Sequence, residues 1–151
     1  MDKLLVLRLP NPQPTSKPIP PQNDLGAAYD SGTRERLNTL RLCAMECRVA
    51  ARTDLFEACA LLRIDGEDAK RTFVTTFIKC FSEAVHGPVK WYRPGVIDVT
   101  FDEAWVLRCL ASIEAGDHSS FEFLLRSRVA KSDRRYIGFL LGRISDQFSQ
   151  V

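Results

Sequence analysis

The stretch EDAKRTFVTTFIKCFSEAVH, residues 67–86, decides the fold. Its aromatic residues recur every four positions, at Phe73, Phe77 and Phe81. Spacings of three and four residues return to the same face of an α-helix, so the stretch predicts a helix with one strongly apolar face. Gly87 and Pro88 follow directly and are typical of a helix end. We therefore expect a helix over about residues 67–86 at the centre of the core.

Two neighbouring regions also have strong helix signals. Before the central helix, apolar residues recur at alternating spacings of three and four from residue 37 to residue 51, and charged residues such as Arg41 occupy the other faces. After it, Thr100 is a good N-cap, and Glu103 three residues later completes a capping box. Gly116 supplies a left-handed stop. A helix is expected in each region, with Arg41 on a polar face of the first.

The C-terminal part of the chain predicts two short helices. The first begins after a cap at Asp117 or Ser119, and its apolar stripe consists of Phe121, Leu124, Leu125 and Val129. The second begins after a cap at Ser132, and its stripe consists of Ile137, Leu140, Leu141, Ile144 and Phe148. Phe139 lies within the second helix and is also expected to pack in the core.

Proline marks the start of the chain, because six of the eight prolines fall between residues 10 and 21. This density excludes helix and central strand. Residues 1–32 are therefore interpreted as a flexible or partner-docked Pro-rich arm, and residues 33–151 as one α-helical domain. Within that domain, residues 91–99 favour extended backbone, with a turn at Pro94 and Gly95 and with Trp91 directed inward as a plug.

Together these elements predict an all-α fold: a single-domain bundle of five or six helices, with one short extended segment and the Pro-rich N-terminal arm. The sixth helix would lie at residues 55–62, where a stripe either continues the first helix or follows a break. A content of 45% hydrophobic and 26% charged residues is ordinary for a soluble globular protein. No run of about 18 apolar residues predicts a membrane span. No secretory leader is recognisable, so we expect a cytoplasmic protein with no membrane contact.

The sequence has no recognisable catalytic constellation. Its two histidines stand at predicted helix ends. Asp102 and Glu103 are adjacent, so they point in different directions on a helix, and their place in a first turn suits the helix dipole. The five cysteines form no C-x-x-C pair and lie in apolar helical runs, which favours buried, reduced thiols. We expect no catalytic residue, metal or cofactor, and hence a protein that is not an enzyme.

The most basic part of the chain is LLRSRVAKSDRRYIGFLLGR, residues 124–143, with a formal charge of +5 against about −3 for the remainder. Its last helix places two glycines one turn apart on the face opposite the apolar stripe, where they predict a shallow groove. This groove would take either a neighbouring helix of the same chain, or a partner helix or an anionic group beside Arg134 and Arg135. That face offers no Asn, Gln or Thr for reading bases. The expected partner-binding residues are Arg126, Arg128, Lys131, Arg134, Arg135, Gly138 and Gly142.

These residues predict a non-enzymatic α-helical adaptor or regulatory protein. It would bind another macromolecule, with an acidic protein surface as the expected partner, through the basic C-terminal helical face. One alternative is a nucleic-acid-binding protein that uses the same basic patch for phosphate contacts. A second alternative is a small thiol-dependent redox protein. The face around Gly138 and Gly142 also offers a place where two copies of the chain can meet.

Overall fold

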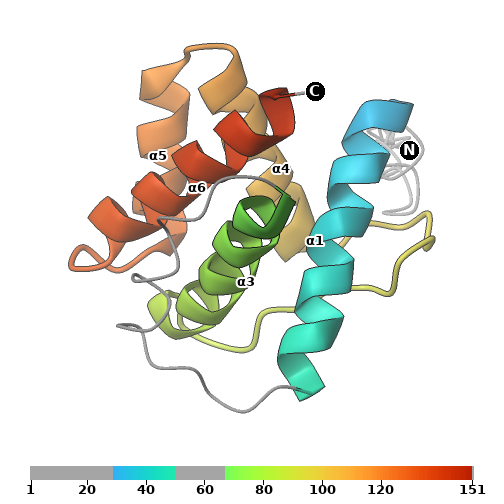
Figure 1. Ribbon diagram of the computed structural model, residues 1–151. Helices are drawn as coiled ribbons and strands as arrows, with labels where there is room; N and C mark the ends of the chain where they lie inside the picture. Colours follow the sequence, from blue (N-terminus) through green and yellow to red (C-terminus); the bar gives the residue numbers. More distant parts are fainter. Residues whose placement is uncertain (1–28, 50–66, 151) are drawn as a thin grey trace, which may run out of the picture.

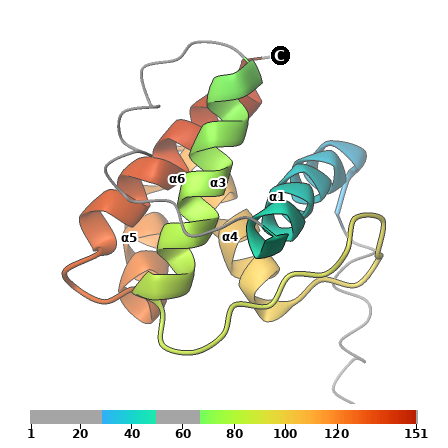
Figure 2. The same cartoon turned by 60° about the horizontal axis from the view of Figure 1, so that its bottom comes forward.

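A computed structural model of the chain describes residues 29–49 and 67–150, and within these ranges it contains five α-helices and no strand. The helices are α1 (Ser31–Val49), α3 (Glu67–Ala84), α4 (Phe101–Glu114), α5 (His118–Arg128) and α6 (Arg134–Ser149). Helix α3 packs on α1 and α6, and α4 packs on α5 and α6. Figures 1 and 2 show α3 between α1 and α6, with α4 behind them. The all-α prediction is confirmed for the described residues.

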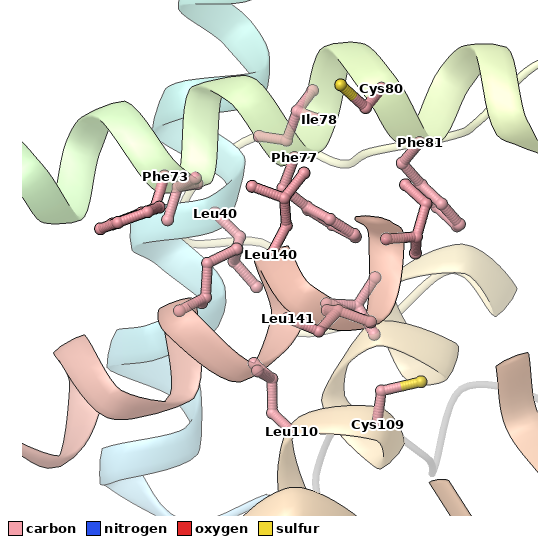
Figure 3. Close-up of a cluster of buried hydrophobic side chains, with 14 of the residues drawn as sticks. Leu40, Phe73, Phe77, Ile78, Cys80, Phe81, Cys109, Leu110, Leu140 and Leu141 are labelled. Atoms are coloured by element: carbon pink, nitrogen blue, oxygen red, sulfur yellow. The ribbon is translucent and has the colours of Figure 1, made fainter. Parts of the chain in front are cut away.

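Helix α3 contains the phenylalanine face that the sequence predicts, and this face lies at the centre of the core. Phe73, Phe77 and Phe81 are buried and project toward α6 (Figure 3). Phe77 and Phe81 stack with ring centroids 5.2 Å apart, and Phe81 stacks on Trp105 of α4 at 5.1 Å. Offset aromatic pairs of this kind stabilise a core beyond their buried area. The aromatic row of α3 therefore joins three helices.

The helix ends mostly follow the local signals. Thr100 caps α4 in a complete capping box, and Asp117 caps α5 through a hydrogen bond from the Ser120 amide. Gly116 adopts a positive φ of 69°, as the stop signal predicts. The cap predicted at Ser132 is wrong: α6 begins one residue later than expected, after an N-cap residue, Asp133, whose side chain makes no capping hydrogen bond. The Ser132 hydroxyl instead donates to the Asp133 carboxylate.

Other expectations fall at the edges of the described residues or outside them. Residues 31 and 32, expected in the arm, form the first turn of α1. The remainder of the arm up to residue 28, and the helix expected at residues 55–62, lie outside the described residues.

Phe139 was expected in the core, but its side chain is 55% exposed. At about 100° per residue, Phe139 lies roughly 160° from the centre of the buried stripe of α6, so it points to the opposite side of the helix. Hydrophobic character alone therefore gave the wrong placement, and helical position decides it.

Residues 85–100 connect α3 to α4 and pass close to α1 (Figures 1 and 2). The predicted turn is present, because the Val96 amide donates to the Arg93 carbonyl and Gly95 adopts a φ of 85°. The predicted plug is also present: Trp91 is buried in the core cluster, and Lys90 and Arg93 are exposed. We call residues 88–100 the connecting segment.

Arg41 of α1 is fully buried and forms an ion pair with Glu103 of α4, which corrects its predicted place on a polar face. The pair is bidentate, with Arg41 Nε donating to Glu103 Oε1 at 2.9 Å and Nη2 to Oε2 at 3.0 Å. Arg41 also donates to the carbonyl oxygens of Val96 and Asp98, both at 2.7 Å. We call this arrangement the Arg41–Glu103 clamp.

The other half of the clamp is made by the Glu103 carboxylate. Its Oε1 accepts the Tyr92 amide at 2.8 Å, and its Oε2 accepts the Thr100 amide at 3.0 Å. Each charged group thus bonds both to its opposite charge and to backbone of the connecting segment. A buried ion pair needs such additional hydrogen bonds to offset the loss of hydration.

Substituting one partner of the clamp should strongly destabilise the fold. We expect Arg41→Met to lower the free energy of unfolding by about 3–5 kcal/mol, because Glu103 is left as an uncompensated buried charge. Adding Glu103→Leu to Arg41→Met should cost less than the sum of the two single substitutions. Urea denaturation measures all three values, with Arg34→Met as a control at an arginine of α1 that makes no ion pair among the described residues. A cost below about 1 kcal/mol for Arg41→Met would contradict the role given to the clamp.

Candidate functional site

A hollow with a volume of about 470 Å³ opens between the connecting segment, α4 and α5. Its main lining side chains are Lys90, Tyr92, Phe101, Trp105, Arg108 and Phe123. We call it the α4–α5 groove. The groove combines residues that are far apart in the sequence, so no single motif could have revealed it.

Two exposed phenylalanines form apolar walls of the groove. Phe101 is the first residue of α4 and is 73% exposed, while Phe123 of α5 is 71% exposed. Phe101 is held from behind by Arg128, whose guanidinium carbon lies 4.9 Å from the centroid of the ring. Large apolar side chains exposed together around a hollow are typical of a binding surface.

A fixed aromatic side chain lies beneath these walls. Trp105 is buried, and its indole Nε1 donates to the Leu124 carbonyl at 3.1 Å. This bond joins α4 to α5 and satisfies the polar atom of the ring. The groove is therefore lined by a preorganised part of the core.

The charge of the groove is positive. Lys90 and Arg108 are exposed members of its lining, and no aspartate or glutamate of residues 29–49 and 67–150 lines it. Neither cation forms an ion pair within the part of the chain that the structure describes. The nearby Asp102 does not neutralise them, because its carboxylate accepts the Lys90 amide at 2.8 Å and pairs with Arg128. Two cations on an apolar hollow suit a ligand that has both an apolar and an anionic part.

Asp102 and Glu103 point in different directions, as the sequence predicts, and pair with Arg128 and Arg41 respectively. Besides interacting favourably with the helix dipole, as predicted, the two carboxylates bond to other parts of the chain. Both side chains are buried, and both accept backbone amides of the connecting segment. These two acids consequently position one wall of the groove.

The basic residues expected to bind a partner are only partly available. Arg126 pairs with Glu122 on the surface of α5, and Arg128 is half-buried against Asp102. Arg134 donates from Nε to the Val129 carbonyl at 2.9 Å, at the end of α5. Of the expected basic residues, Lys131 and Arg135 are exposed and form no ion pair among the described residues.

The two glycines of α6 have different surroundings. A Cβ atom at Gly138 would lie 3.2 Å from Leu125 Cδ1 and 3.8 Å from Phe121 Cζ, so α5 packs directly against this position. A Cβ atom at Gly142 would meet no described residue within 4 Å. Packing within the chain therefore explains Gly138 and leaves Gly142 open.

The described cysteines are free thiols, and most of them are buried. Cys43, Cys80 and Cys109 lie in the core, and Cys47 is half-buried. Burial raises the pKa of the Cys109 thiol to about 12, and it also raises the pKa of Cys43 and Cys47. Cys59 lies outside the described residues. Within the described ranges, no three His, Cys, Asp or Glu side chains are grouped as a metal site.

Comparison with known proteins gives no relative: no protein-family model, no curated protein and no solved structure matches this chain. Among the described helices, none is long and apolar enough to cross a membrane. The groove has therefore to be interpreted from its own chemistry.

The thiol chemistry can be checked directly. We expect Cys109 to stay unmodified during brief treatment of the native protein with iodoacetamide at pH 8, because a thiol with a raised pKa keeps its proton there and is not nucleophilic. Among Cys43, Cys47, Cys80 and Cys109, the half-buried Cys47 should react first. Peptide mass spectrometry measures each site, with urea-unfolded protein as the control. Equal rates for Cys109 in native and unfolded protein would contradict its burial.

Proposed function

We propose that this protein is a non-enzymatic adaptor or regulatory module that binds an acidic segment of another protein in the α4–α5 groove. One observation supports the proposal above all: two exposed phenylalanines line the same hollow as two cations that form no ion pair among the described residues, and no acidic side chain of these residues lines it. The proposal keeps the acidic protein partner that is expected from the basic residues of the chain. It places the binding site of that partner in the α4–α5 groove rather than on the C-terminal helical face.

The contacts made within the chain support this choice of surface. Arg126, Arg128 and Arg134 already bond to groups within the chain, so binding a partner would require breaking or sharing these contacts. Lys90 and Arg108 form no ion pair with a described residue, and the Lys90 ammonium lies 5.8 Å from the ring centroid of Tyr92, which also lines the groove. Arg128 contributes indirectly in this proposal, because it supports the ring of Phe101.

The groove also indicates how the partner would be held. An apolar side chain of the partner would lie between Phe101 and Phe123, where burial of apolar surface stabilises the complex by about 25 cal/mol per Å². Acidic side chains on either side of that anchor would face Lys90 and Arg108. Buried aromatic anchors supply most of the binding energy in protein interfaces, whereas charges at the rim mainly set orientation and association rate.

Binding of single-stranded nucleic acid is the second candidate, since Tyr92, Phe101 and Phe123 lie near two cations and bases stack on aromatic rings. The number of cations favours the protein partner. Nucleic-acid affinity grows with each phosphate that is neutralised, and the groove offers only Lys90 and Arg108 among its lining residues. A redox function of the thiols has less support, because burial raises the pKa of Cys43, Cys47 and Cys109.

Peptide selection on the intact chain tests the proposal. We expect a random-peptide display library to yield sequences in which an aromatic or leucine anchor is flanked by Asp or Glu. Phe123→Ser should weaken binding of a selected peptide by about thirtyfold, as for a hot-spot residue. Arg108→Glu should weaken it by reversing a charge. Both positions are exposed, so circular dichroism and the melting temperature should stay near those of the parent protein.

The matched control is Arg135→Glu, which makes the same charge change on α6 and should leave peptide binding unchanged. Loss of binding in the Arg135 variant, with no effect at Phe123 and Arg108, would move the site back to the C-terminal helical face. Fluorescence anisotropy with a labelled 20-mer of single-stranded DNA or RNA at low salt is the parallel measurement. Oligonucleotide binding that depends on Phe123 and Arg108, without any selected peptide, would replace the protein partner by nucleic acid.

A further inference from the structure

Helix α6 presents a second surface that the proposed function does not use. Its buried residues face α3 and α4, and its exposed side has a stripe that spans most of the helix. The stripe consists of four exposed residues and one half-buried glycine, and these are Arg135, Phe139, Gly142, Asp146 and Ser149. The successive spacings are four, three, four and three residues, which is the heptad spacing of a helix that packs along another helix. We call it the α6 stripe.

We propose that the α6 stripe binds a second copy of this chain, with the two α6 helices antiparallel about a twofold axis that passes between residues 140 and 141. In this register Phe139 of one copy lies opposite Gly142 of the other, and Arg135 lies opposite Asp146. Twofold symmetry makes each contact twice. In an antiparallel coiled coil the alternate positions of the stripe face one another in this way.

Shape supports a second copy as the occupant. Phe139 is 55% exposed, although it is a large apolar side chain. Gly142, three residues further on, is half-buried, but no described residue lies within 4 Å of the place where its Cβ atom would be, so among these residues nothing blocks a ring from approaching the helix backbone there. A glycine inside a helix costs about 1 kcal/mol relative to alanine. Packing against α5 explains that cost at Gly138, and in this proposal the Phe139 ring of the second copy explains it at Gly142.

Charge supports the same orientation. Arg135 forms no ion pair in the described ranges, and Asp146 has only a long contact of 3.7 Å with Arg143. The positive end of the stripe therefore lies near the start of α6 and the negative end near its C-terminus. Antiparallel packing places each end against its opposite, and it also aligns the two helix dipoles favourably. Parallel packing would place Arg135 against Arg135, which like-charge repulsion disfavours.

Complementary charge reversal gives a sharp test. Arg135→Asp alone places two aspartates opposite one another at both ends of the dimer, and Asp146→Arg alone places two arginines there. Each variant should dimerise about tenfold more weakly than the parent protein. When the two variants are mixed, every aspartate at position 135 faces an arginine at position 146 and every aspartate at position 146 faces Arg135. The equimolar mixture should therefore recover an affinity near that of the parent protein.

Recovery in the mixture can come only from contacts between copies. Residues 135 and 146 of one helix are about 16 Å apart along its axis, too far for an ion pair. Sedimentation equilibrium over a series of protein concentrations measures the dissociation constants. A parent protein that is monomeric at every concentration up to the millimolar range would overturn the proposal, and so would a mixture that associates no better than either variant alone.

Gly142→Leu provides a second variant that does not depend on charge. Its side chain would fill the space opposite Phe139 and should abolish dimerisation. The monomer should keep or raise its melting temperature, because leucine favours helix more than glycine does and no described residue lies within 4 Å of the Cβ position. A Gly142→Leu protein that dimerises like the parent protein would overturn the proposed register. Peptide binding in the α4–α5 groove should be unaffected, so the proposal is tested separately from the proposed function.

Discussion

The ion pair between Arg41 and Glu103 is buried on both sides, with side-chain exposures of 1% and 0%. Removing two charges from water is costly, and the pair is stable only because its remaining hydrogen-bonding capacity is used. The donors and acceptors that the ion pair itself leaves free bond to the backbone. Arg41 donates to carbonyl oxygens of the connecting segment, and Glu103 accepts the amides of Tyr92 and Thr100. A segment without regular secondary structure is thereby fixed between α1 and α4.

The candidate groove depends on this constraint. Glu103 also closes the capping box of α4. The residue that fixes the connecting segment therefore also fixes the start of the helix, where Phe101 lies. Tyr92 and Lys90 lie on the other side of the same network. Opposite them, α5 is held by the Trp105 indole and by the pair of Arg128 with Asp102. Several buried polar contacts thus hold the three segments in place, and the exposed aromatic rings and cations of these segments lie together on one surface.

Local signals in the sequence predict much of the fold. The row of phenylalanines in α3, the capping box at Thr100 and the stop at Gly116 each depend on a few neighbouring residues. Arg41 was misplaced because hydrophobic periodicity assigns every charged residue to solvent, and a partner 62 positions away cannot be recognised from spacing. Phe139 was misplaced for the opposite reason, because its apolar side chain was assigned to the core although its helical position places it on the exposed side of α6. The groove could not be predicted, because its lining comes from three segments whose packing only the tertiary structure defines.

Amide hydrogen exchange in the native protein tests the central claim, that the clamp fixes the connecting segment. The account predicts that the amides of Tyr92 and Thr100, which donate to the Glu103 carboxylate, exchange as slowly as that of Phe77 in the core of α3. The Ile97 amide, which makes no hydrogen bond within the described residues, is the fast reference in the same segment. Exchange of Tyr92 and Thr100 as rapid as that of Ile97 would contradict the account.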